Sequence, residues 1–130
     1  MALMGFREPN QVKWVGTRPA HRGTQITKSD TAANATTILH TVTAGKVFYL
    51  CGFTFCVYLS AAGIWTGLIV RDAGGVTQYH LANICSPIVD SQVLSLEFMV
   101  PLEIPSAYDV CTYSLGVTAI SFAFIHGWEE

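Results

Sequence analysis

The chain has 130 residues, of which 51% are hydrophobic and only 12% are charged, and its formal net charge is −2. One domain accounts for this length, and a domain of this size buries roughly two-thirds of the surface that its unfolded chain exposes. The charged share is about half of the roughly 25% typical of globular domains. This argues against a stable isolated monomer and predicts that a membrane, further copies of the chain or a larger assembly covers apolar surface.

The charges are divided unevenly along the chain. Residues 1–46 carry six basic and two acidic side chains, a balance of +4, whereas residues 47–130 carry one basic and seven acidic side chains, a balance of −6. A basic segment and an acidic body attract each other between neighbouring copies. We therefore expect a protein partner for the basic segment. Contact with nucleic acid is the less favoured alternative, and a segment that is merely solvated stays open.

Residues 1–35 are predicted to form an extended N-terminal arm, because glycine and proline interrupt them repeatedly and only Val12 to Val15 could form a short strand. The small, polar stretch from Lys28 to Thr37 is predicted to be a linker or loop. Arg7 and Glu8 come early and no continuous apolar segment precedes them, so we expect no secretory signal. Without export, reduced thiols are expected at Cys51, Cys56, Cys85 and Cys111.

A run of 24 residues, Val47 to Val70, contains no charged side chain and no histidine. Roughly 20 apolar residues suffice for a membrane-spanning helix, so length alone makes this run a candidate. Its β-branched and aromatic residues favour strands instead, and a turn is expected where Ser60 to Gly63 interrupt it. We predict two buried strands, with a membrane span as the alternative.

Both faces of the first strand in this run are apolar. Tyr49, Phe53 and Phe55 lie on one parity, and Phe48, Leu50, Cys56 and Tyr58 lie on the other. An antiparallel sheet normally exposes one face to water, so two apolar faces indicate a core on one side and a second subunit, or the arm, on the other.

The remaining segments also predict strands. Ile64 to Val70 and Val76 to Ala82 form a hairpin around Gly74 and Gly75, which supply positive φ angles. Gln92 to Val100 alternates, with Leu94, Leu96, Phe98 and Val100 inward and Glu97 outward. Pro101 and Pro105 predict a bend or an edge after it. With Thr37 to Val42, Tyr108 to Leu115 and Val117 to Trp128, residues 36–130 are predicted to form an all-β, antiparallel β-sandwich domain, a jelly roll of seven or eight strands.

No residue pattern identifies a reaction. The four histidines stand singly, no paired-histidine or Cys-x-x-Cys spacing occurs, and the glycine pair follows and precedes strands as turn glycines do. We therefore expect no catalytic residues, no metal ion and no cofactor, and we predict that the protein is not an enzyme.

The aromatic residues leave a second class of function open. Flat aromatic faces stack on sugar rings, so aromatic residues could form the platform of a lectin-like module or a host-adhesion protein. The candidates are Trp14, Trp65, Trp128, Tyr58, Tyr79, Tyr108 and Tyr113. Core and subunit contacts are the favoured explanation for most of them. Trp14, between Lys13 and Arg18 in the arm, is predicted to anchor in a pocket of a neighbour.

Several segments together resemble a known kind of protein: VKWVGTRPAHRG in the arm, TVTAGKVFYL, the hairpin IVRDAGG, the bend VPLEIPSAYDVC and the closing FIHGWEE. They resemble the small β-sandwich structural proteins of tailed bacteriophages and related viruses, of the head-decoration kind. The resemblance implies a non-enzymatic capsid decoration or cement protein that forms homo-oligomers, often trimers, and binds the major capsid protein or another virion protein through its arm. It also implies assembly in the host cytoplasm and a final place in the virion.

For such a protein, the expected assembly contacts are basic and aromatic residues of the arm together with large apolar residues of the uncharged run. They are Arg7, Lys13, Trp14, Arg18, Arg22, Phe53, Phe55 and Trp65.

Overall fold

The computed structural model describes residues 23–59, 65–85, 90–115 and 119–130. The strands in them are β1 (Thr24–Ala33), β2 (Ala35–Thr41), β3 (Phe48–Leu59), β4 (Trp65–Arg71), β5 (Thr77–Cys85), β6 (Asp90–Ile104), β7 (Asp109–Leu115) and β8 (Ala119–Glu129). The uncharged run thus forms β3 and β4, as predicted, and residues 60–64 between them lie outside the described residues. None of the described segments is a helix long and apolar enough to cross a membrane.

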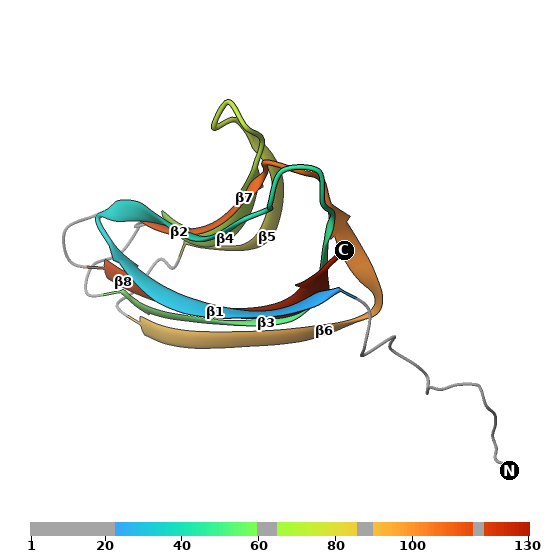
Figure 1. Ribbon diagram of the computed structural model, residues 1–130. Helices are drawn as coiled ribbons and strands as arrows, with labels where there is room; N and C mark the ends of the chain where they lie inside the picture. Colours follow the sequence, from blue (N-terminus) through green and yellow to red (C-terminus); the bar gives the residue numbers. More distant parts are fainter. Residues whose placement is uncertain (1–22, 60–64, 86–89, 116–118) are drawn as a thin grey trace, which may run out of the picture.

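The strands form two antiparallel sheets of four that face each other as curved layers (Figure 1). Sheet I has the order β1-β8-β3-β6, and sheet II has the order β2-β7-β4-β5. Consecutive strands therefore occupy corresponding positions in opposite sheets, as in a jelly roll, in which two Greek keys build a double sheet. This confirms the predicted all-β sandwich and its eight strands.

The core lies between the two sheets. Sheet I contributes Phe48, Leu50, Phe53, Phe55 and Ile125, and sheet II contributes Leu68, Val70 and Val110, all of them almost completely buried. These side chains come from strands that are distant in the sequence. The hydrophobic effect of removing them from water is therefore what holds the two sheets together.

A β-bulge in β3 determines which side chains reach this core. Leu50 pairs with Gly127 and Gly52 pairs with His126, which leaves Cys51 as an extra residue opposite β8. The extra residue reverses the alternation of faces. The parity groups expected from the sequence were therefore wrong across the bulge: Phe48 and Leu50 face inward together with Phe53 and Phe55, and Tyr49 faces outward with Cys56 and Tyr58.

The stretch predicted to be a linker forms strands instead. Residues 24–33, assigned from the sequence to the arm, are β1, which pairs along its whole length with β8. The chain then passes through Asn34, at φ 52°, directly into β2. Small polar residues suit β1 because it is an edge strand whose outer side chains meet water, and its backbone hydrogen bonds come from β8. Residues 1–22, the rest of the predicted arm, lie outside the described residues.

Strand β8 turns its small side chains inward. Ala119, Ser121 and Ala123 are buried, whereas Ile120 and Phe122 on the other parity are exposed. Small inner residues let β8 approach β7, where Thr112 Oγ1 lies 2.9 Å from Ser121 Oγ. The large apolar side chains of Ile120 and Phe122 are thereby left on the outer face of the molecule.

The hairpin of β4 and β5 is confirmed. Gly75 has φ 82°, and the Asp72 side chain accepts hydrogen bonds from the amides of Gly74 and Val76. Only Gly75 of the glycine pair has a positive φ. The prolines are also where they were expected, because Pro101 lies in β6, an edge strand of sheet I. Four residues of β6, Phe98 to Pro101, leave the register with β3, so Val100 is exposed instead of inward as predicted.

A buried carboxylate connects the two sheets at one end. Glu129 of β8 is 3% exposed, and its Oε2 accepts hydrogen bonds from His40 Nε2 of β2 at 2.7 Å and from the Thr43 amide at 2.9 Å. Burial alone would raise the pKa of Glu129, but the hydrogen bonds from Thr43 and His40 and the nearby imidazole outweigh it, so the pKa lies below its ordinary value. The ionised form of Glu129 is therefore stabilised by the fold.

The first prediction concerns the two kinds of phenylalanine. We expect Phe55→Ala to lower the free energy of unfolding by about 3–5 kcal/mol, because it opens a cavity between the sheets. The matched change Phe122→Ala removes an outward side chain and should cost about 1 kcal/mol or less. Denaturant unfolding of both variants measures this, and equal losses would contradict the observed orientation of the strands.

The second prediction concerns pH. The contribution of Glu129 to stability should be complete above the ordinary carboxyl pKa of about 4.3 and should be lost as the pH falls through the lower folded-state pKa. Glu129→Gln should lower the free energy of unfolding at neutral pH by about 1–3 kcal/mol and flatten its acid dependence. Urea titrations over a pH series test this, with the exposed Glu103→Gln as the control that should change little.

Candidate assembly interface

The outer face of sheet I carries an unusual number of large apolar side chains. Because cross-strand partners share a face, the register aligns Phe122 of β8 with Cys56 of β3 and Val93 of β6 in one row. The next row contains Ile120 of β8 and Tyr58 of β3. We call these five residues, Cys56, Tyr58, Val93, Ile120 and Phe122, the outer patch.

The outer patch is exposed although it is apolar. Phe122 is 39% exposed, Ile120 49%, Tyr58 52% and Val93 71%. Cys56, Tyr58, Ile120 and Phe122 line a shallow hollow in this face. Single exposed apolar residues are common on proteins, whereas contiguous apolar patches mark interaction sites.

The surroundings of the outer patch are uncharged. On β1, Thr31 pairs with Phe122 and Ala33 pairs with Ile120. On the other side, Thr54 and Ser95 join their hydroxyl groups at 2.8 Å. A partner that covered the outer patch would therefore desolvate no charge among these described neighbours, which keeps the cost of association low.

Polar, ionisable side chains lie farther along the same face of sheet I. His126 Nε2 of β8 lies 2.6 Å from Glu97 Oε2 of β6, and this contact passes over Gly52 of β3, which pairs with both residues. Next to them, the Trp128 and Tyr49 rings stack with their centroids 5.0 Å apart. His126 is thus hydrogen-bonded to Glu97 on the outer face.

Gly52 is what allows the Glu97 side chain to cross β3. A Cβ at this position would lie 2.7 Å from the backbone oxygen of Leu96 and would collide with the Glu97 carboxylate. Because Gly52 has no side chain, the Glu97 side chain of β6 can cross β3 and reach His126 of β8.

The structure separates the predicted contact residues into three groups. Arg7, Lys13, Trp14, Arg18 and Arg22 lie outside the described residues, so their role stays a prediction. Phe53 and Phe55 are buried in the core, because the bulge at Cys51 turns them inward, and the outward positions of their strand belong to Cys56 and Tyr58. Trp65 is half-exposed on the outer face of sheet II beside Leu115.

The outer patch was only partly visible in the sequence. Cys56 and Tyr58 were recognised as a second apolar face, but Val93, Ile120 and Phe122 were not connected with them. The alternation of large and small residues in β8 was the available signal. This alternation does not reveal which strands lie beside β8, so it could not connect Ile120 and Phe122 with Cys56, Tyr58 and Val93.

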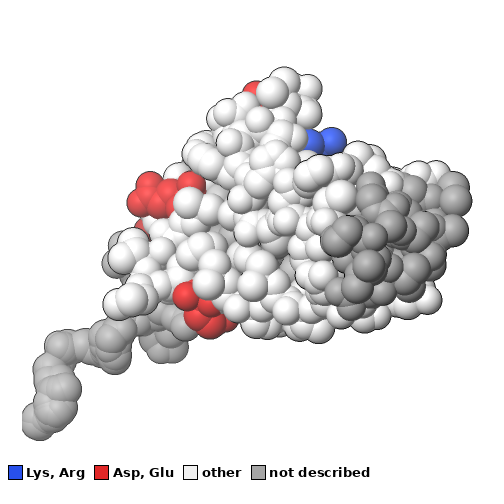
Figure 2. All heavy atoms as spheres, turned by 180° about the vertical axis from the view of Figure 1, so that it is seen from behind, with Lys and Arg blue, Asp and Glu red and all other residues white. Residues whose placement is uncertain are grey.

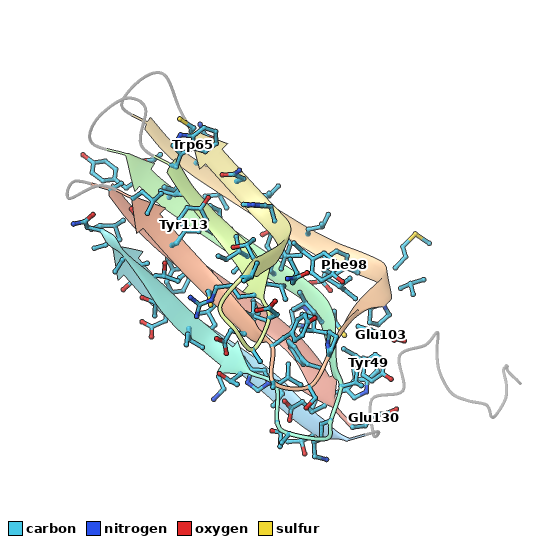
Figure 3. The ribbon with its side chains drawn as sticks, turned by 90° about the horizontal axis from the view of Figure 1, so that it is seen from above. Tyr49, Trp65, Phe98, Glu103, Tyr113 and Glu130 are labelled. Atoms are coloured by element: carbon cyan, nitrogen blue, oxygen red, sulfur yellow. The ribbon has the colours of Figure 1, made fainter. Side chains whose placement is uncertain are left out.

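The aromatic residues suggested as a sugar platform do not come together among the described parts of the chain. Trp65 lies at one end of the molecule, and Tyr49, which stacks on Trp128, lies at the other (Figure 3). Trp128 is itself buried. Tyr113 is also buried, and its hydroxyl group donates a hydrogen bond to Asn83 Oδ1 at 3.1 Å.

The thiols and charged groups form no reaction centre within the described residues. All four cysteines are free. Burial raises the pKa of the Cys111 thiol to about 11, with Arg71 acting to lower it and Asp109 adding to the rise, so this thiol is protonated at neutral pH. In the described segments no three His, Cys, Asp or Glu side chains are grouped so that they could hold a metal ion.

The surface as a whole is poor in charge. The side of the molecule shown in Figure 2 is mostly covered by uncharged residues, with Asp and Glu in small separate groups and few Lys or Arg. This agrees with the composition of residues 47–130, in which Arg71 is the one basic residue besides histidine.

No protein-family model and no curated protein sequence matches the chain. Two solved structures are similar to it, each described as a pentameric capsid protein isolated from metagenomic phage sequences. The first is 19% identical with a TM-score of 0.50; the match covers 78% of this chain and 59% of that one, so this chain spans about three-fifths of its length. The second is 17% identical with a TM-score of 0.52, covering 92% of this chain and 81% of that one. At such identities the likeness demonstrates a shared fold.

The role of Gly52 yields a prediction. We expect Gly52→Ala to lower the free energy of unfolding by about 1–3 kcal/mol, because the new methyl group must displace backbone of β6 as well as the Glu97 carboxylate. Gly74→Ala, in an open turn, is the matched control and should cost less than about 1 kcal/mol. Denaturant unfolding compares the two, and a harmless Gly52→Ala would refute the close crossing.

Proposed function

We propose that the protein is a non-enzymatic structural protein of a virus particle that associates with copies of itself through the outer patch. The observation that carries this proposal is the outer patch, a contiguous apolar surface without charge on the face of sheet I that points away from the core. Packing of the two sheets against each other does not bury these residues. Association is then the remaining way to remove them from water.

The structural likeness supports the same class of function. Both similar structures are described as pentameric phage capsid proteins, and they share the two-sheet architecture. Fold alone does not imply function. The combination of this fold with an exposed apolar face and a low charge is what favours an assembly protein over a catalytic one.

Within this class we propose the role of a capsid decoration or cement protein. The basic N-terminal residues, with Arg7, Lys13, Arg18 and Arg22, would bind an acidic surface of the capsid or of a neighbouring copy, as opposite charges direct association. The role requires no cofactor, metal ion, membrane or nucleic acid. It places the protein in the virion.

The number of copies is part of the proposal. The resemblance noted in the sequence implies a trimer, whereas the similar solved structures are described as pentamers. Both are closed rings, in which each copy contributes two different surfaces. A standard interface buries about 800 Å² per partner, so the outer patch would be the centre of a larger contact.

Analytical ultracentrifugation tests the proposal. We expect the full chain to sediment as one closed oligomer, with three or five copies distinguished by its mass. Ile120→Lys together with Phe122→Lys should shift the population towards monomers, because two charges would be buried in the interface. Val76→Lys, an exposed apolar residue of the β4 and β5 hairpin, is the control and should leave the oligomer intact.

Circular dichroism of the same samples confirms that both variants are folded. A chain that sediments as a monomer at high concentration would refute self-association. An oligomer that survives the two lysines on the outer patch would show that the contact lies elsewhere.

A further inference from the structure

Strand β6 is an edge strand whose inward side chains are not fully covered. Among the strands of the described residues, it pairs with β3 on one side and is the last strand of sheet I on the other. Leu94 and Leu96 pair with Phe55 and Phe53, so they lie on the face of the sheet that forms the core. They are nevertheless 41% and 44% exposed. A further strand beside β6 would bury both leucines.

The opposite edge of the same sheet is different. In β1, Lys28 pairs with Ile125 and Asp30 pairs with Ala123, so both charges occupy positions on the inner face. Inward charges on an edge strand discourage the addition of another strand. The inner-face positions of β6 opposite Phe53 and Phe55 carry leucine instead. Of the two edges of sheet I, β6 is the one built to accept a strand.

Charge indicates which strand would be accepted. The sequence of β6 contains Asp90, Glu97 and Glu103 and no lysine or arginine. If the β6 strands of two copies paired with each other along their outer edges, acidic side chains would come close together. This repulsion disfavours pairing of two copies through β6. Residues 1–22 of this chain carry four basic side chains and one acidic one, a balance of +3.

The sequence of these residues also suits the site. Val12 to Val15, the part predicted to form a short strand, has Val12 and Trp14 on one parity and Lys13 on the other. Beside β6, the Val12 and Trp14 side chains could cover the exposed leucines while Lys13 faces the side on which Glu97 lies. Main-chain hydrogen bonds to an open edge and side-chain pockets on alternate residues are how sheets bind extended segments.

We propose that residues 12–15 of one copy add as a strand to the open edge of β6 in a neighbouring copy, next to Leu94 and Leu96. The inference deepens the proposed self-association and rests on it, because it names the acceptor of the basic N-terminal segment. That acceptor is a second copy of this chain.

The position of the segment explains why a neighbour receives it. Residue 23 precedes β1, which lies at the edge of sheet I opposite β6. The segment that is donated precedes β1, and the strand that accepts it, β6, is at the opposite edge of the same sheet. Donation from each copy to the next therefore arranges the copies side by side in a head-to-tail order. Such contacts generate rings when the rotation closes. The seven residues 16–22 between this segment and residue 23 would span roughly 23 Å if extended, at about 3.3 Å each, which is enough to reach a strand edge of a copy packed alongside β1.

Isotope-mixed cross-linking of the full chain tests the proposal. Copies labelled with nitrogen-14 and nitrogen-15 are refolded together and treated with a carbodiimide, which joins lysine amines to carboxylates in contact. Lys13 is the one lysine before residue 28, so its products are unambiguous. We expect mass spectrometry to find Lys13 joined to Glu97 or Glu103 in peptides that combine both isotopes.

Matched variants locate the contact. Leu94→Lys should reduce the yield of these links several-fold, because it places a positive charge where the basic segment binds. Leu115→Lys, at an exposed leucine on sheet II, should leave the yield unchanged. Trp14→Ser tests the contact from the donor side without altering any described strand, and it should also lower the yield.

Three results would overturn the inference: no link from Lys13 to β6, links confined to one isotope, or links that fall on Asp72 or Asp109 of the other sheet. Its failure is distinguishable from failure of the proposed function. If the lysine substitutions at Ile120 and Phe122 dissociate the oligomer but no Lys13 links are found, the proposed self-association stands and only the strand addition is refuted. A monomeric chain defeats both.

Discussion

One extra residue in β3 controls how the apolar content of this chain is divided between core and surface. Cys51 forms a bulge against β8, and the alternation of faces is reversed across it. Without that reversal, either Phe48 and Leu50 or Phe53 and Phe55 would point to solvent, because a strand shifted by one residue exchanges its two faces. The bulge lets four large side chains enter one core. It also leaves Cys56 and Tyr58 beside Phe122 on the outer face of sheet I.

Few charged side chains lie near the outer patch. The described carboxylates in contact with histidine are Glu129, buried between the sheets, and Glu97, which reaches His126 across Gly52. Neither adjoins the outer patch in register, so association there would disturb neither hydrogen bond. The outer edge of β6, beside Leu94 and Leu96, is a second apolar surface, and Glu97 and Glu103 of the same strand are acidic. The described residues thus present a neutral apolar face and an edge strand with acidic side chains.

Local signals predicted the elements that depend on local geometry. The hairpin of β4 and β5 was found because a glycine turn between apolar segments has few other conformations, and Gly75 has the expected positive φ. Pro101 was predicted to lie at a bend or an edge, and it lies in the edge strand β6. The assignment of residues 28–33 to a linker was wrong because small polar residues are also suitable for an edge strand, whose stability comes from pairing with β8. No property of those residues alone reveals that partner.

The sequence by itself determined the fold class, the strands of the uncharged run and the expectation of hidden apolar surface, since composition, turn residues and side-chain alternation act over short distances. It determined the contact residues less well. Phe53 and Phe55 were expected at a subunit contact and lie in the core, whereas Val93, Ile120 and Phe122 form the outer patch. Only the tertiary structure decided this, because the face that a strand buries depends on a bulge and on which strands pair beside it, and those partners lie far away in the chain.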